Sequence, residues 1–216
     1  MNYNIIGSSS KGNCIIVENV LMLDCGVTYV KIKSYLKDVK LIFISHIHKD
    51  HMMPSTIKKI AYNKPTIKFI CGSNEVVKKL VEYGIKKKNI FLLKEGIRYD
   101  LGILKVRLIY MYHDVSNFGL KWEIKGKKGI YIVDTEKIDH IVAQDYDLYL
   151  IEANYKQEIL EKHLKECSID EKVYLERVPK THLSWNQANT FLIENMGDNS
   201  VFQYIHESPY NFEGDE

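Results

Sequence analysis

The chain alternates short apolar runs with segments in which apolar residues recur every three or four positions. In the first half, the short runs predict buried strands over residues 4–6, 14–18, 20–24, 41–44, 67–71 and 90–93. Helical spacing predicts helices that open at Thr28 and at Pro54, and a third helix over residues 74–83. Strands that alternate with helices in this way are expected of an α/β fold.

The second half is richer in strands. Apolar runs predict strands over residues 106–111, 118–124, 130–133, 148–151 and 201–205, with residues 126–129 joining the second to the third. Helices are predicted over residues 157–167, 170–177 and 184–196. No repeat, low-complexity tract or linker interrupts the chain, so we expect its 216 residues to form one domain, 1–216.

Composition restricts the class of protein more than its function. With 45% hydrophobic and 27% charged residues, the sequence is typical of a globular protein and not of a disordered one. The net charge of +2 allows a local basic patch for a polyanion, for example at lysines 86–88 or at lysines 125, 127 and 128, but does not argue for one. No cysteine pair has metal-type spacing, so buried reduced thiols are expected.

The sequence also carries no sign of export or membrane insertion. The first residues do not combine a basic segment with an apolar one, so no secretory signal is visible. No apolar run approaches the length that crosses a membrane. We therefore expect a cytoplasmic protein with no membrane partner, whose oligomeric state the sequence leaves open.

The most informative stretch follows the apolar run at 41–44 and carries four ligand-type side chains, His46, His48, Asp50 and His51. Neutral imidazoles and carboxylates are the ligands that divalent transition metals prefer. Alternation along an extended segment places the first two histidines on one side, where both reach one ion, and leaves the other two for a second ion. The alternative is a polar loop that is rich in histidine by chance.

This His-x-His-x-Asp-His pattern after a strand resembles the signature of the metallo-β-lactamase superfamily. The resemblance implies a four-layered α/β/β/α sandwich and a site for two divalent ions, most simply Zn²⁺ with Mn²⁺ as a rival. It also implies further ligands at three strand ends, matched here by His113, Asp134 and His206. The respective alternatives are a loop histidine, an aspartate that caps a helix, and a histidine on the surface.

His182 stands apart from these residues because it precedes a predicted helix. Ser184 and Gln187 form a capping box at the start of that helix. Free amides and the helix dipole favour an anion at such a position, so His182 is predicted to contact a phosphate or to protonate a leaving group. The alternative is a packed loop residue. We assign neither His140, in a charged stretch predicted to be helical, nor His163, on a predicted solvated face, to the site.

Further motifs resemble the small WalJ/YycJ branch of that superfamily. They are the opening at residues 7–14, the His-Leu-Ser triplet at 182–184 and the strand-end His206. Ribonuclease Z has a comparable pair of late histidines. Members of the branch are taken to be metal-dependent nucleases, notably 5′ exonucleases on DNA. Pro54, Thr181 and Tyr155 depart from the branch pattern, which puts loop shape and substrate choice in doubt.

The resemblance and the residues together predict a binuclear hydrolase of phosphodiester bonds, with nucleic acid as the expected substrate. One ion would be held by His46, His48 and His113, the other by Asp50, His51 and His206, and Asp134 would bridge them. A water shared by the ions would lose a proton and attack phosphorus, oriented by Asp50. The alternatives are a hydrolase of a cyclic nucleotide, thioester or lactone, and a non-catalytic binding module.

Overall fold

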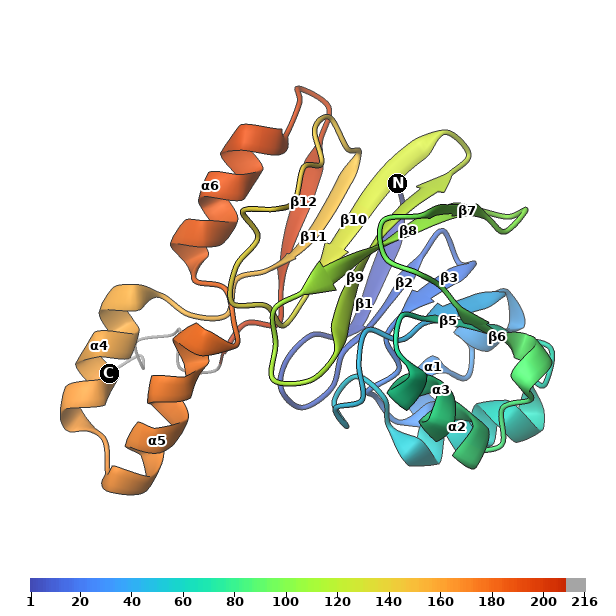
Figure 1. The fold of residues 1–216 in the computed structure, drawn as a ribbon, viewed down its shortest axis with the longest axis horizontal. Helices are drawn as coiled ribbons and strands as arrows, with labels where there is room; N and C mark the ends of the chain where they lie inside the picture. The colour runs from blue at the N-terminus through green and yellow to red at the C-terminus, as the bar shows by residue number, and fades with distance from the viewer. Residues whose placement is uncertain (209–216) are drawn as a thin grey trace.

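Two six-stranded sheets form the centre of the molecule (Figure 1). The structure is a computed structural model that describes residues 1–208, apart from the side chain of residue 170, so the end of the predicted 1–216 domain lies outside it. The first sheet runs in chain order through β1 (Tyr3–Gly7), β2 (Cys14–Val17), β3 (Leu21–Leu23), β4 (Leu41–Phe43), β5 (Lys68–Cys71) and β6 (Ile90–Leu92). Its first three strands are antiparallel, and β3 to β6 are parallel.

The second sheet has the order β12-β11-β10-β9-β8-β7. Its strands are β7 (Arg98–Asp100), β8 (Lys105–Met111), β9 (Asn117–Ile124), β10 (Lys127–Ile132), β11 (Leu148–Glu152) and β12 (Val201–Ile205). The strands from β7 to β10 are antiparallel, whereas β10, β11 and β12 are parallel. Parallel strands end at the same edge of a sheet, so the residues after β10, β11 and β12 lie close together.

Helices cover the outer face of each sheet (Figure 1). The helices α1 (Tyr29–Ile32), α2 (Pro54–Asn63) and α3 (Asn74–Glu82) pack on the first sheet, and α6 (Trp185–Asn195) packs on the second. A pair formed by α4 (Gln157–Glu166) and α5 (Ile169–Arg177) lies beside the second sheet. The short 3₁₀ turns are η1 (Tyr35–Lys37), η2 (Lys87–Asn89) and η3 (Val178–Lys180).

Three apolar cores hold these layers together. One lies between the sheets and includes Phe43, Leu120 and Tyr131, all at most 1% exposed. The second joins the first sheet to α1–α3, and the third joins the second sheet to α6. Alternate residues of the strands face opposite cores, as the two-residue period of a strand requires. The predicted α/β/β/α sandwich is therefore confirmed.

Several local predictions differ from the structure. The helix expected from Thr28 is only α1, with η1 after it, and residues 126–129 are not a simple loop, because β10 begins at Lys127. The strand β7 was not predicted, since Arg-Tyr-Asp shows no apolar run. The predicted helical stretch at 136–140 forms no helix, although His140 is exposed there as expected of a charged segment.

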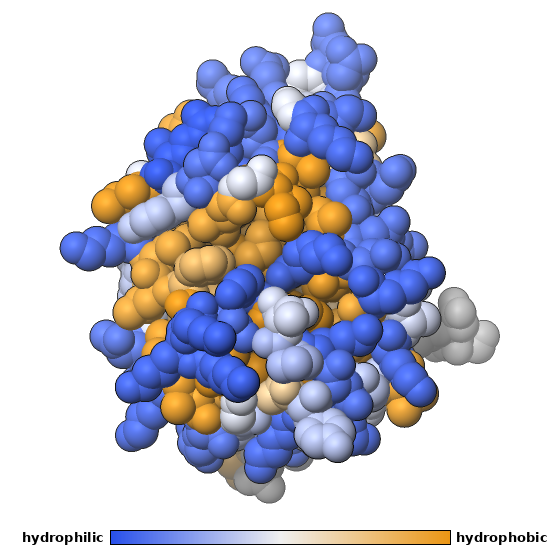
Figure 2. Space-filling view, turned by 90° about the vertical axis from the view of Figure 1, so that its right-hand side faces the viewer, coloured by the Kyte–Doolittle hydropathy of each residue, from blue (hydrophilic) through white to orange (hydrophobic). Residues whose placement is uncertain are grey.

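One face of the molecule shows a band of hydrophobic side chains between hydrophilic ones (Figure 2). This is the side on which β6 and β7, the outer strands of the two sheets, lie (Figure 1). Leu92, Ile97 and Ile103 in this part of the chain are each about half exposed, at 45–48%. Within residues 1–208, no helix is both long and apolar enough to cross a lipid bilayer.

Candidate metal centre

The predicted ligands of the second sheet meet at the ends of its parallel strands. Asp134 follows β10, Glu152 closes β11 and His206 follows β12. The strand register pairs Glu152 with Ile205, the residue before His206. All three side chains are buried, at 0–3% exposure. The sheet alone therefore brings two carboxylates and an imidazole to one point.

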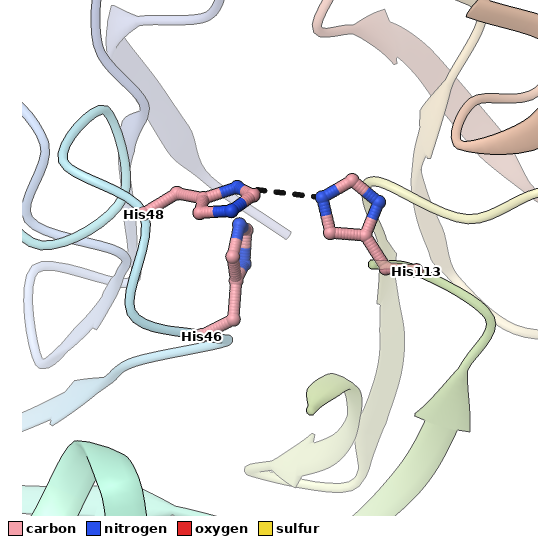
Figure 3. Close-up of side chains that lie close together, drawn as sticks. All are labelled: His46, His48 and His113. Carbon is pink, nitrogen blue, oxygen red and sulfur yellow. Dashed lines mark hydrogen bonds between the residues drawn. The ribbon is translucent and has the colours of Figure 1, made fainter. Parts of the chain in front are cut away.

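The first sheet supplies the residues after β4. His46 and His51 are fully buried, and His48 and Asp50 are half-buried. The backbone amides of His51 and Met52 both donate to the carbonyl of His48, so the chain turns there and returns Asp50 and His51 to the strand end. His113 comes from the segment after β8 and lies next to His48, with 3.4 Å between His113 Nε2 and His48 Nδ1 (Figure 3).

The side chains form three groups in which the potential ligand atoms lie within 4.8 Å of one another. These groups are His46, His48 and His113; Asp50, His51, Asp134 and His206; and Asp134, Glu152, His182 and His206. The first two correspond to the two ion sites predicted from sequence. The third adds Glu152 and His182, which the sequence interpretation had not placed among the ligands. All seven predicted ligands thus lie together, and His182 lies beside them.

Three imidazoles of the centre have a partner at Nδ1. His46 Nδ1 is 2.9 Å from Ser45 Oγ, His51 Nδ1 is 2.7 Å from Asp24 Oδ2, and His113 Nδ1 is 3.1 Å from the Thr181 carbonyl. An outer-shell partner of this kind fixes the ring and leaves Nε2 for a metal. Among the described residues, Nε2 of His46 and Nε2 of His206 are buried without a hydrogen-bond partner. Because buried polar atoms are normally paired, these orphaned nitrogens fit a metal centre.

Asp24 is the outer-shell carboxylate with the most contacts. It accepts hydrogen bonds from the amide and hydroxyl of Ser45, at 2.8 and 2.9 Å, and from Tyr131 Oη at 2.8 Å. The same carboxylate holds His51. Sequence reasoning missed Asp24, although an aspartate at the end of a buried strand, in Asp24-Cys25-Gly26, was the available signal.

We expect Asp24→Asn to weaken metal binding by about 10–100-fold, the usual effect of losing an outer-shell partner. The single oxygen of the asparagine can keep the bond from the Ser45 amide at the Oδ1 position, but its NH₂ group then stands at the Oδ2 position, against Tyr131 Oη and His51 Nδ1. Competition with a chromogenic chelator measures the affinity. The exposed Asp38 at the end of η1 offers a matched control, Asp38→Asn. Equal affinities of both variants would remove Asp24 from the account.

Three residues of the centre have an unusual backbone conformation. Asp24, Asp134 and His206 have φ angles of +57°, +49° and +54°, in the left-handed region that residues other than glycine seldom adopt. Each such residue costs about 1–3 kcal/mol and persists only where its surroundings enforce it. Asn117 Nδ2 enforces the turn at Asp134 by donating to the carbonyls of Val133 and Asp134, at 3.0 and 2.7 Å.

The opening of the chain supports the metal loop. The amide of Asn13 donates to the Asp50 carbonyl at 2.6 Å, and Asn13 Nδ2 lies 2.9 Å from His51 Nε2. Gly26 faces the same loop, and a Cβ there would lie 1.6 Å from the Asp50 carbonyl oxygen. Ser8 Oγ accepts a hydrogen bond from the amide of His206 at 2.8 Å. The Gly-Ser-rich opening at residues 7–14 is therefore part of the centre's framework.

Glu152 is the functional residue that sequence reasoning missed most clearly. Its Oε1 is 2.6 Å from His182 Nδ1 and 3.1 Å from His206 Nδ1, and its Oε2 accepts the Thr135 amide at 3.1 Å. The carboxylate is completely buried. Its signal in the sequence was a charged residue that closes the apolar strand at 148–151.

The carboxylates control the protonation of the histidines near them. Burial alone would lower the pKa of His182, but Glu152 and Asp134 outweigh it and raise that pKa to about 10. The pKa of His206 rises to about 9 against the same effect of burial, mainly through Asp134. His46 is the opposite case, because burial and the neighbouring His51 lower its pKa well below the ordinary value. The neutral His46 suits a metal ligand, whereas His182 and His206 share the two carboxylates that raise their pKa values.

The centre opens into a cleft of about 180 Å³. His48, Asp50, His113, Asp134, His182 and His206 line it together with Ser10, Tyr174, Arg177, Val178 and Thr181. Arg177, on α5, pairs with Asp114, whose Oδ1 is 3.1 Å from His113 Nε2. An arginine at the rim of a histidine and carboxylate cleft can bind an anionic group.

The three departures from the branch pattern have structural roles. Pro54 occupies the first turn of α2, where proline is well tolerated. The Thr181 carbonyl holds His113, as described above. Tyr155 is buried, and its carbonyl accepts the amide of Trp185 at 2.9 Å, which ties the segment after β11 to the start of α6.

The local structure predicted next to His182 is confirmed. Ser184 and Gln187 form the predicted capping box of α6. His140 lies outside all three donor groups, where it is 2.9 Å from the Tyr110 carbonyl. His163 is also outside them, but it is half-buried in α4 and not on a solvated face as predicted.

Solved structures share this architecture. The metallo-β-lactamase fold protein YhfI from Bacillus subtilis superposes with a TM-score of 0.71 at 14% identity, over 95% of this chain and 85% of that one. The short form of human tRNase Z gives a TM-score of 0.67 at 16% identity, over 96% and 93%. Zn²⁺-bound PqqB from Methylobacterium extorquens gives 0.66 at 11% identity, over 98% and 90%. The chain therefore has the metallo-β-lactamase fold.

Sequence comparisons match a smaller part of the chain than the structural comparisons do. No protein-family model matches the chain. The inactive human cytidine monophosphate-N-acetylneuraminic acid hydroxylase is 34% identical over 98 residues, which are 44% of this chain and 20% of that protein. The hydroxylase from Pongo pygmaeus is 33% identical over 98 residues, which are 44% of this chain and 17% of that protein. The match thus spans about a fifth of these curated relatives or less.

Proposed function

We propose that the protein is a metal-dependent hydrolase of phosphodiester bonds that acts on nucleic acid as an exonuclease. The observation that carries the proposal is one cleft that contains two donor groups joined by Asp134, with the Glu152–His182 pair beside them. Histidine and carboxylate groups of this kind can hold metal ions. A protonated imidazole next to them suits cleavage of a bond whose leaving group needs a proton.

In this proposal His46, His48 and His113 would hold the first ion, and Asp50, His51 and His206 would hold the second. Asp134 contacts histidines of both sets, with its Oδ2 3.4 Å from His46 Nε2 and 2.8 Å from His51 Nε2. The donor set fits Zn²⁺, and Mn²⁺ is the alternative. Two bound cations supply Lewis-acid charge and lower the pKa of a coordinated water.

The remaining side chains divide the other tasks. Arg177 and the protonated His182 attract the phosphate, which is anionic at every physiological pH. Glu152 keeps His182 charged and oriented, so that its Nε2 can donate a proton to the departing oxygen. Asp50, whose pKa is held below its ordinary value by the neighbouring His206 and His51 despite burial, stays ionised and can orient the attacking water.

Proteins of similar fold support this choice of chemistry without defining the substrate. Besides human tRNase Z, they include the long form of RNase Z from yeast, with a TM-score of 0.65, and a diphosphatase from the PhnP family, with a TM-score of 0.63. Within proteins of this fold, the opening at residues 7–14 and the late histidines His182 and His206 favour the WalJ-type exonuclease branch. A cytoplasmic location and a nucleic acid partner remain part of the proposal.

A small-molecule hydrolase is the second candidate, because the cleft of about 180 Å³ is small. The test is digestion of 5′- and 3′-end-labelled single- and double-stranded DNA and RNA, with and without Zn²⁺ or Mn²⁺, beside a panel of cyclic nucleotides. The proposal expects metal-dependent shortening of a nucleic acid from one end. Hydrolysis of a cyclic nucleotide with intact polymers would instead establish the second candidate.

We also expect the purified protein to contain up to two transition-metal ions per chain. The orphaned nitrogens of His46 and His206 lie in separate donor groups, so each group has a free imidazole for its own ion. Elemental analysis after purification without chelator measures the content. Absence of metal, with no uptake of added Zn²⁺ or Mn²⁺, would contradict the assignment of both sites.

A further inference from the structure

A second hollow, of about 230 Å³, lies on the outer face of the second sheet, away from the metal centre. Five cationic side chains line it, Arg98, Lys105, Arg107, Lys121 and Lys128, and Glu123 is the carboxylate among its described lining residues. Arg107 lies four residues before Met111, the end of β8, which is about 13 Å along a strand. The hollow is therefore separate from the cleft that contains the histidines.

The strand register places three of these cations side by side. Arg98 of β7 pairs with Arg107 of β8, which pairs in turn with Lys121 of β9. Residues directly opposite one another in a sheet lie close enough that like charges destabilise it. A row of three cations across adjacent strands is thus a cost to the fold unless a negative charge compensates for it.

The described side chains compensate only part of this charge. Glu123 pairs with Arg98 at 2.7 Å and with Lys105 at 3.3 Å, so one carboxylate serves two cations. Among the described residues, Arg107 has no carboxylate within ion-pair distance. Among the side chains that line the hollow, five cations and one carboxylate leave an excess of four positive charges. Such an excess favours a ligand with more than one negative charge.

Lys121 and Tyr146 are half-buried walls of the hollow, and their contacts hold them in place. Lys121 is half-buried, and its Nζ donates to the Val142 carbonyl at 2.5 Å. Its Nζ and that of Lys128 lie 5.9 and 5.8 Å from the centre of the Tyr146 ring. Burial and Arg107 both lower the pKa of Lys121, as expected of an ammonium held among other cations. The half-buried Tyr146 ring gives the hollow an aromatic wall.

We propose that this hollow is a phosphate-binding site. A phosphate group matches both the fork of donors on an arginine and the point charge of a lysine, and it carries the multiple charge that the excess requires. The phosphate belongs either to a small molecule or to the backbone of a nucleic acid, and the aromatic wall suits a base or another flat group beside it. The proposal is independent of the reaction at the metal centre.

The test compares two variants of equal charge change, Arg107→Gln/Lys121→Gln and Lys31→Gln/Lys33→Gln. The second pair is exposed at the end of α1, outside the hollow. Isothermal titration calorimetry with inorganic pyrophosphate and fluorescence anisotropy with a labelled 12-nucleotide DNA are both carried out on the full chain in a chelating buffer. Thermal unfolding checks the fold, and removing two like charges should leave the melting temperature equal or higher.

We expect the Arg107/Lys121 variant to bind at least one probe about tenfold more weakly or worse, and the Lys31/Lys33 variant to bind within about twofold of the wild type. Weakening for DNA alone assigns the phosphate to a nucleic acid backbone, and weakening for pyrophosphate alone assigns it to a small molecule. Unchanged binding, equal weakening in both variants, or no binding of either probe by the wild type would overturn the proposal. Because no hydrolysis is measured, these outcomes do not depend on the proposed nuclease activity.

Discussion

Asp134→Ala is expected to lose both metal ions and all measurable hydrolysis while keeping its fold. The Asp134 carboxylate lies between the two donor groups, within 3.4 Å of nitrogens on His46 and His51, and its Oδ1 is 3.1 Å from His206 Nδ1. No other described carboxylate contacts histidines of both predicted ion sites so closely. The loss of metal affinity in Asp134→Ala should therefore exceed the 10–100-fold effect of replacing an outer-shell partner.

The fold should survive because Asn117 binds the backbone carbonyls of Val133 and Asp134, not the carboxylate. Elemental analysis and far-ultraviolet circular dichroism measure the two properties. Asp139→Ala, at an exposed aspartate on the same segment, is the matched control and should keep both metal and activity. Normal activity of Asp134→Ala would mean that the ions are bridged elsewhere and that the residue after β10 has been misinterpreted.

His182→Ala is expected to keep both ions and to lose catalysis by about 10²–10⁴-fold, the usual contribution of a general acid. The imidazole is bound to Glu152, and the predicted ligand sets are complete without it. The defect should shrink on bis(p-nitrophenyl) phosphate, whose leaving group needs no proton. Measuring kcat for this substrate and for an oligonucleotide, with the metal content of each preparation, gives both results.

Two other outcomes would change the assignment of His182. An equal defect on both substrates would show that it binds the phosphate instead of donating a proton. Loss of an ion would make it a ligand, which the third donor group, with Asp134, Glu152 and His206, would explain. Glu152→Gln separates these roles further, because it keeps a hydrogen-bond acceptor for His182 but removes the charge that raises its pKa.

The short and clearly bounded apolar runs were sufficient to predict most strands of an α/β fold, and the resemblance of the histidine motif added the four-layered sandwich. Ligand-type side chains directly after a buried strand identified the residues after β4, and the resemblance extended the set to those after β8, β10 and β12. The short strand β7 could not be predicted, because its Arg-Tyr-Asp sequence pairs with β8 through the backbone and not through an apolar pattern.

What the sequence lacked were partners that depend on tertiary contact. Asp24 and Glu152 act on His51 and on His182 and His206, residues 27 or more positions away. Arg177 lines the cleft only because α5 ends there. The hollow around Arg107 and Lys121 likewise arises from cross-strand register, which is invisible in a list of lysines and arginines.

The most direct test of the central claim is a metal titration of phosphodiesterase activity. Metal-stripped protein receives increasing Zn²⁺ or Mn²⁺, and hydrolysis of bis(p-nitrophenyl) phosphate is measured at each ratio of ion to chain. We predict that hydrolysis depends on added metal, rises until two ions are bound per chain and then reaches a plateau. Absence of hydrolysis at every loading of either metal, in protein shown to bind the ions, would contradict a phosphodiesterase at this centre.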